Sequence, residues 1–205
     1  MNKKLLKILF LAFLVCVSRV ALPGENDAVK LVEGFHETLL DVMKNADSLG
    51  YQGRFDRLAP SFNEKFDIPL ISQVILSRYW NELSPEQQQN FIHLFMKLSI
   101  STYASRFDKY DGEEFKTTGV EELKKGRLLV RTEFIRKNEE SVKFDYLLHQ
   151  KDGNWYIISV IANGVNDLSV KRSEYGTIIN DRGFDSLVGE IERKIEELSS
   201  TTNSG

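Results

Sequence analysis

One stretch of the chain, residues 68–110, constrains the fold more than any other. Its sequence is IPLISQVILSRYWNELSPEQQQNFIHLFMKLSISTYASRFDKY, and it predicts two helices that meet at Leu83-Ser84-Pro85. Ser84 is suited to cap the second helix, and Pro85 is suited to its first position. Apolar side chains cover roughly two-thirds of the second helix, a wider face than a surface helix shows. We therefore expect this helix to be covered on several sides or to line an apolar cavity.

After Tyr110 the hydrophobic period changes from helical to alternating, which indicates an antiparallel sheet. Gly119 suggests a bulge or bend in the first strand, and residues 137–140 and 151–154 form links short enough for hairpins. Such a sheet has one apolar face, so neighbouring helices must cover it. The predicted strands are residues 114–123, 127–136, 141–150 and 155–162.

Helical patterns lie on both sides of these strands. The sequence predicts a first helix over residues 27–46, and this helical section of the chain ends at Gly50. A short helical turn is expected over residues 52–58 and stops at Pro60. Further helices are expected from Pro69 and over residues 170–180 and 185–198. The fold class is therefore α+β, with N-terminal and C-terminal helices packed on a curved four-stranded antiparallel sheet (NTF2-like) that encloses an apolar pocket. A solid core is the alternative.

The N-terminus has the composition of an export signal. Lys3 and Lys4 precede an apolar run at residues 5–17 that only Lys7 interrupts. The run is too short to span a bilayer comfortably and is followed by Arg19. We expect residues 1–21 to be a signal peptide, with cleavage between residues 18 and 24, and the protein to be periplasmic. Residues 22–198 would form one lipid-binding domain and residues 199–205 a disordered tail. An uncleaved N-terminal anchor is the alternative.

Charge and cysteine content exclude several classes of function. Cleavage removes Cys16, the only cysteine, so the mature chain would have no disulfide and no thiolate site. It would carry 23 basic and 30 acidic residues, a net charge of −7, which disfavours nucleic-acid binding. The three histidines are isolated in the sequence, and no metal-binding, nucleophile-elbow or nucleotide-binding motif is present. The sequence therefore predicts no catalytic residue, no metal site and no cofactor.

The predicted pocket would bring together large apolar side chains from the sheet and the helices. Arg172, with Lys171 beside it, would engage an anionic headgroup at the mouth, although both residues also fit an ordinary solvated surface. An enzyme acting on a polycyclic lipid would need an acid or base in the pocket, for which Asp145 and His36 are the candidates. The predicted lipid-binding residues are Leu40, Met43, Ile75, Phe95, Leu98, Tyr103, Phe134, Phe144, Tyr146, Trp155, Ile157 and Arg172.

The chain also resembles a known family, the periplasmic phospholipid carriers called the MlaC or toluene-tolerance auxiliary family. The chain departs from the family pattern at Ser159, Lys171 and Tyr175. The segment Ala162–Leu168 is most similar to the hopanoid-associated, HpnM-like branch. The resemblance lies in Phe66-Asp67, Val74–Trp80, Ser84–Gln88, Phe91, Phe95, Tyr103, Trp155–Ile158, Gly164-Val165, Leu168, Arg172, Tyr175 and Gly183–Leu187.

This resemblance implies a soluble carrier that buries acyl or polycyclic lipid without chemistry. It implies transfer between an inner-membrane lipid ABC transporter and an outer-membrane lipid complex, or a resistance-nodulation-type lipid exporter, with phospholipid or a hopanoid-like lipid as cargo. We expect a monomer whose only ligand is the lipid. The alternatives are the lipid enzyme and a membrane-tethered interaction module.

Overall fold

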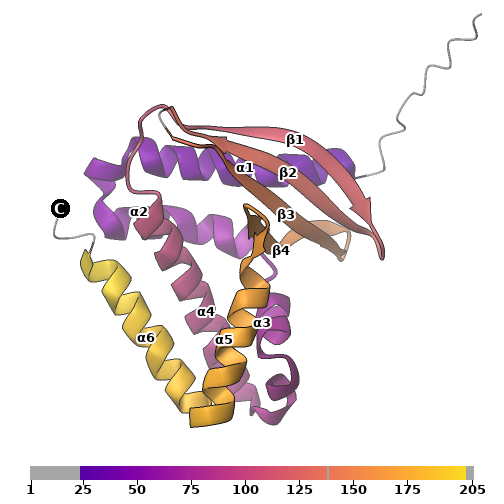
Figure 1. The fold of residues 1–205 in the computed structure, drawn as a ribbon, viewed down its shortest axis with the longest axis vertical. Helices are drawn as coiled ribbons and strands as arrows, with labels where there is room; N and C mark the ends of the chain where they lie inside the picture. Colours follow the sequence, from indigo (N-terminus) through magenta and orange to yellow (C-terminus); the bar gives the residue numbers. More distant parts are fainter. Residues whose placement is uncertain (1–23, 138, 202–205) are drawn as a thin grey trace, which may run out of the picture.

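The computed structural model describes residues 24–137 and 139–201, and it shows helices, then a sheet, then helices (Figure 1). The α+β prediction is confirmed. Residues 1–21, including Cys16, lie outside the described part. No helix in the described ranges is long and apolar enough to cross a membrane. The elements are α1 Glu25–Lys44, α2 Ala46–Lys65, α3 Ile68–Leu76, the 3₁₀ helix η1 Ser77–Glu82, α4 Pro85–Arg106, β1 Glu114–Leu123, β2 Arg127–Ile135, β3 Val142–Lys151, β4 Asn154–Ala162, β5 Val165–Asn166, α5 Asp167–Arg182 and α6 Phe184–Thr201.

The sheet follows the chain in the order β1-β2-β3-β4-β5, and all neighbouring strands are antiparallel. The four predicted strands are present, and the bulge predicted at Gly119 is confirmed by a register shift between Thr117 and Gly119. The predicted strand count of four was wrong, because β5 pairs with the end of β4. Two residues are too few to show an alternating pattern, so this strand had no signal in the sequence.

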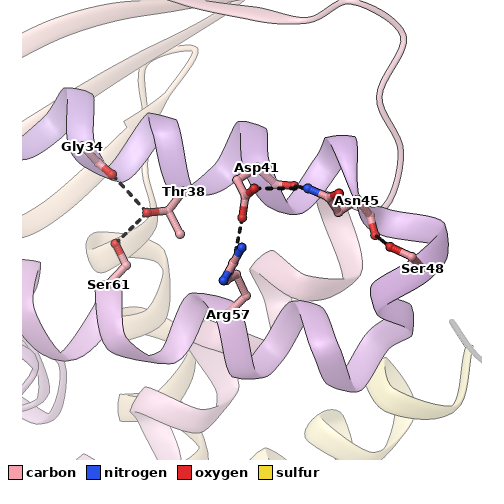
Figure 2. A network of polar contacts seen from close by, with 7 residues as sticks. All are labelled: Gly34, Thr38, Asp41, Asn45, Ser48, Arg57 and Ser61. Carbon is pink, nitrogen blue, oxygen red and sulfur yellow. Dashed lines mark hydrogen bonds and ion pairs between the residues drawn. The ribbon is translucent and has the colours of Figure 1, made fainter.

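The sheet lies along α1, the other helices lie on the same side of it, and α2, α3 and α5 also contact β4 (Figure 1). α1 and α2 form an antiparallel hairpin. Figure 2 shows the polar contacts that join them: Arg57 Nε lies 2.7 Å from Asp41 Oδ2, and the hydroxyls of Thr38 and Ser61 lie 3.4 Å apart. The apolar faces of the two helices remain free to pack inward, so the hairpin forms one wall of the core.

Of the two boundaries predicted in this region, one was wrong and one is confirmed. Pro60 does not stop a helix but lies inside α2, where the buried side chains of Leu58 and Phe62 flank it. Their packing offsets the roughly 3 kcal/mol that an interior proline costs a helix. The break instead lies at Gly50, whose φ of 58° and ψ of −174° interrupt α2, so the predicted section end there is confirmed.

The tail prediction was wrong for residues 199–201, because α6 continues to Thr201. The hydroxyls of Ser199 and Ser200 donate to the carbonyl oxygens of Glu196 and Glu197 and so extend the last turn. Residues 202–205 lie outside the described part.

The long apolar helix predicted from the opening stretch is α4, and its start is confirmed. Ser84 Oγ accepts a hydrogen bond from the Gln87 N–H, and Gln87 Oε1 accepts one from the Ser84 N–H, which makes a complete capping box. The helix before it ends earlier than predicted, at Leu76, and η1 occupies residues 77–82. α4 packs against α2, α3 and α6, which accounts for its wide apolar face.

Candidate functional site

A cavity of about 740 Å³ lies between the helices and the sheet. α2, α3 and α4 supply most of its helical wall, and β2, β3 and β4 supply the sheet side. The N-terminus of α5 and the end of α6 border its opening. The predicted pocket is therefore present, and the core is hollow on this side. Its apolar lining comprises Met43, Phe62, Phe66, Ile68, Ile71, Ile75, Phe95, Leu98, Tyr103, Phe107, Phe134, Val142, Phe144, Ile158, Val160, Ala162, Val165, Leu168 and Leu198.

Seven of the twelve predicted lipid-binding residues border this cavity and come from five different elements. The structure brings them together from positions up to 101 residues apart in the chain. Whether they bind lipid stays a prediction. They are Met43, Ile75, Phe95, Leu98, Tyr103, Phe134 and Phe144.

The other five predicted residues lie elsewhere. Tyr146 and Ile157 are almost fully buried in the solid part of the core. Leu40 and Trp155 are half-buried and pack against that core. Arg172 lies outside the cavity, because its guanidinium Nη2 donates to Ser77 Oγ at 2.9 Å in a separate groove. Strand periodicity predicted the correct face for Tyr146 but not its depth along the strand.

Aromatic rings form much of the cavity wall. The rings of Phe62 and Phe66 stack with their centroids 4.6 Å apart, and the edge of Tyr103 meets Phe62 at 5.2 Å. On the sheet side, Phe134 and Phe144 lie 6.3 Å apart. Burial raises the pKa of Tyr103, so its phenol stays neutral at physiological pH. The wall therefore presents uncharged surface to any ligand.

Charged side chains gather at the border of the cavity, and most of them are basic. Lys171 pairs with Glu174 at 3.5 Å, and Arg136 pairs with Glu139. In the described ranges, Arg106 and Lys109 have no carboxylate within 4 Å. Neither residue was predicted from the sequence; both follow the apolar face of α4 just before the chain enters β1. The five basic residues are Arg106, Lys109, Arg136, Lys171 and Lys194, and the acidic residues are Glu113, Glu139 and Asp167.

Two smaller polar features complete this border. Ser159 is buried in β4, and its hydroxyl donates to Asn166 Oδ1 at 3.1 Å. The same oxygen accepts the Ser169 N–H and caps α5. The side chain of Glu113 is buried and accepts the Asp111 N–H at 2.6 Å. These contacts tie the sheet and the loop before β1 to the mouth of the cavity.

The candidates for acid–base chemistry do not reach the cavity. The imidazole of His36 is buried between Tyr146, at 3.0 Å, and the stacked ring of Phe115. Asp145 pairs with Arg131 at 3.5 Å and does not border the cavity. Within the described residues, no group of three or more histidine, cysteine or carboxylate side chains could hold a metal ion. The arrangement favours binding of an apolar molecule with an anionic end.

Comparison with known proteins gives a consistent result. The family model described as MlaC protein matches residues 33–193. The intermembrane phospholipid transport system binding protein MlaC of Haemophilus influenzae is 21% identical over 203 residues, which cover 94% of this chain and 92% of that protein. The solved structure of a phospholipid-binding protein from Ralstonia solanacearum, in complex with a phospholipid, has a TM-score of 0.75 at 20% identity. The structural match covers 84% of this chain and 98% of the Ralstonia chain.

Proposed function

This chain belongs to the MlaC family, and from that premise we propose that it binds a phospholipid in the 740 Å³ cavity and carries it between membranes. Members of the family are lipid-binding transport proteins and not enzymes. The observation that carries the proposal for this chain is the cavity itself, which combines an uncharged aromatic and aliphatic wall with a basic border. That pair of features matches the two ends of a phospholipid.

The size of the cavity supports a ligand of this class. Small-molecule sites have volumes of about 300–1,000 Å³, and the cavity falls within this range. Each methylene group removed from water contributes about 0.8 kcal/mol. Ten such groups would contribute roughly 8 kcal/mol before the cost of association. Acyl chains can therefore supply a large part of the binding free energy without covalent chemistry.

The basic border supports a position for the headgroup. Arg106 and Lys109 retain free donors for a phosphate, because neither has an ion-pair partner in the described ranges. Lys171, which the sequence predicted as a headgroup contact, borders the same opening, but its ammonium group already pairs with Glu174. We place the phosphate near Arg106 and Lys109, with the acyl chains between α4 and the sheet.

The wider setting of the protein belongs to the same proposal. Residues 1–21 would direct export to the periplasm, and residues 22–198 would act there as one domain and as a monomer. The carrier would exchange lipid with an inner-membrane ABC transporter and with an outer-membrane lipid complex or a resistance-nodulation-type exporter. The resemblance of Ala162–Leu168 favours the HpnM-like branch and a hopanoid-like cargo, and the helix-covered curved sheet favours an NTF2-like description.

Native mass spectrometry of protein purified from a periplasmic extract without detergent tests the proposal. We expect one lipid per chain, and the mass of the lipid separates a phospholipid from a hopanoid. Protein that carries no lipid and does not take up added phosphatidylglycerol from vesicles would contradict carriage. Sequencing the N-terminus of the same sample tests cleavage between residues 18 and 24.

A further inference from the structure

A second hollow, a groove of about 520 Å³, lies between η1 and α5. Ile75 borders both hollows, so α3 separates this groove from the lipid cavity. Unlike the cavity, the groove is bordered mainly by polar side chains. Two of them are the arginines Arg78 and Arg172, which come from η1 and α5. An apolar ligand would gain little here, so the groove needs an occupant of different chemistry.

The groove is built around a strained residue. Ser77 follows the last residue of α3 and has φ 51° and ψ −119°, a conformation that costs a residue with a β-carbon about 1–3 kcal/mol. Its hydroxyl accepts the hydrogen bond from Arg172 Nη2 at 2.9 Å. This contact joins the start of η1 to α5 and holds one guanidinium in the groove.

The second guanidinium is also held in place. Arg78 Nη2 donates to the hydroxyl of Tyr79 at 2.6 Å, and its guanidinium carbon lies 4.7 Å from the centre of that ring. A β-carbon added to Gly176 would lie 3.9 Å from the Tyr79 ring, so the ring approaches α5 closely. Tyr79 therefore positions Arg78 beside the helix that carries Arg172.

Neither guanidinium has a carboxylate within 4 Å in the part of the chain that the structure describes. Asp181 is the one acidic residue among those bordering the groove. A guanidinium has five N–H donors, so each keeps donors free for an incoming anion, and a carboxylate fits their planar geometry.

We infer that this groove docks a partner protein through a carboxylate-bearing segment, with Arg78 and Arg172 as the charged contacts. A membrane surface fits less well, because the two guanidiniums are held in a recess between η1 and α5, which a protruding peptide segment can enter and a flat surface cannot. The inference goes beyond lipid carriage and does not depend on it, since the groove and the cavity lie on opposite sides of α3.

The test uses the full-length mature protein and a fluorescein-labelled hexaglutamate peptide, with binding measured by fluorescence anisotropy at low salt. We expect saturable binding that Arg78→Gln and Arg172→Gln each weaken about tenfold, the loss of one charge-assisted hydrogen bond. Arg127→Gln is the matched control, because Arg127 is an exposed arginine at the start of β2 and does not border the groove. It should bind the peptide as the unchanged protein does, and a hexaglutamine peptide should not bind.

Three results would overturn the inference. One is the absence of hexaglutamate binding at low salt, and another is equal binding by the unchanged protein and both groove variants. The third is binding to phosphatidylglycerol vesicles that requires Arg78 and Arg172 while the peptide is ignored, which would assign the groove to a membrane. If Arg172→Gln fails to fold because it loses the hydrogen bond to Ser77, peptide binding by Arg78→Gln alone tests the inference. Lipid content measured on the same samples keeps the outcome separate from that of lipid carriage.

Discussion

His36 Nε2 and the hydroxyl of Tyr146 lie 3.0 Å apart in the interior and join α1 to β3. The imidazole is 4% exposed, and its ring stacks on Phe115 at a centroid distance of 4.0 Å. In the described ranges no carboxylate pairs with it, and burial lowers the pKa of His36 to about 3. The pair is therefore a neutral hydrogen bond inside the core, and protonation of the imidazole opposes folding.

This pair predicts a loss of stability in acid. The pKa of His36 is about 3 in the folded protein against an ordinary value of 6.5, so its contribution is complete above pH 6.5 and declines as the pH falls toward 3. The decline is about 1.4 kcal/mol per pH unit, or roughly 2 kcal/mol between pH 6.5 and 5. Urea unfolding at several pH values measures it. His36→Gln should remove this part of the slope, whereas the exposed control His93→Gln should keep it; equal slopes in both variants would contradict the assignment.

The cavity wall predicts that a charge can remove the ligand without unfolding the protein. In Phe95→Arg or Leu98→Arg the new side chain can extend into the hollow, where an unpaired charge costs an apolar ligand several kcal/mol. We expect lipid occupancy to fall at least tenfold while circular dichroism shows a folded protein. Ile195→Arg is the control, because Ile195 is buried on α6 and does not border the cavity, so this substitution should unfold the chain. If Phe95→Arg unfolds in the same way, the site does not tolerate a long side chain as proposed.

The basic border predicts an electrostatic contribution to headgroup binding. Replacing both Arg106 and Lys109 by glutamine removes the two cations of the cavity border that have no ion pair in the described ranges. We expect the affinity for phosphatidylglycerol to fall about tenfold and to depend less on salt, as for other partly exposed charge contacts. Lys116→Gln changes one exposed cation on β1 and should have little effect. Unchanged affinity in the double variant would place the phosphate elsewhere.

Two arginines on α2 predict very different effects on stability. Arg54 is 3% exposed, and its guanidinium donates to the carbonyl oxygens of Ala104 at 2.8 Å and Ala46 at 3.1 Å. Arg54→Met leaves these buried acceptors without the donor, and we expect a loss of about 2–4 kcal/mol in the free energy of unfolding. Arg57 forms the exposed pair with Asp41 shown in Figure 2, so Arg57→Met should cost less than about 1 kcal/mol. Urea unfolding compares the two, and similar losses would contradict this account.

Much of the fold was predictable because its signals are local. The change from helical to alternating period located the sheet, and the motif at Ser84 located the start of α4. Pro60 and β5 were not predictable in this way. A proline is a local stop signal that the packing of Phe62 overrides, and a two-residue strand is defined only by its partner β4.

The candidate site was predictable only in part, for a related reason. Periodicity shows which side chains share a face, and seven of the predicted residues do border the cavity. It does not show how deep each one lies, so Tyr146 and Ile157 were placed in the cavity but belong to the core. Nor does it show where a long side chain is directed, so Arg172 was assigned to the headgroup although it binds Ser77.

The sequence by itself determined the elements, their apolar faces and the absence of a catalytic motif, because these depend on residues a few positions apart. Only the tertiary structure decided that the core is hollow beside α4 and that Arg106 and Lys109 border the opening. It also decided that Arg78 and Arg172 share a groove. A cavity is a space left between elements far apart in the chain. Its existence depends on how side chains such as Phe95 and Phe134 meet across that space, which no local pattern encodes.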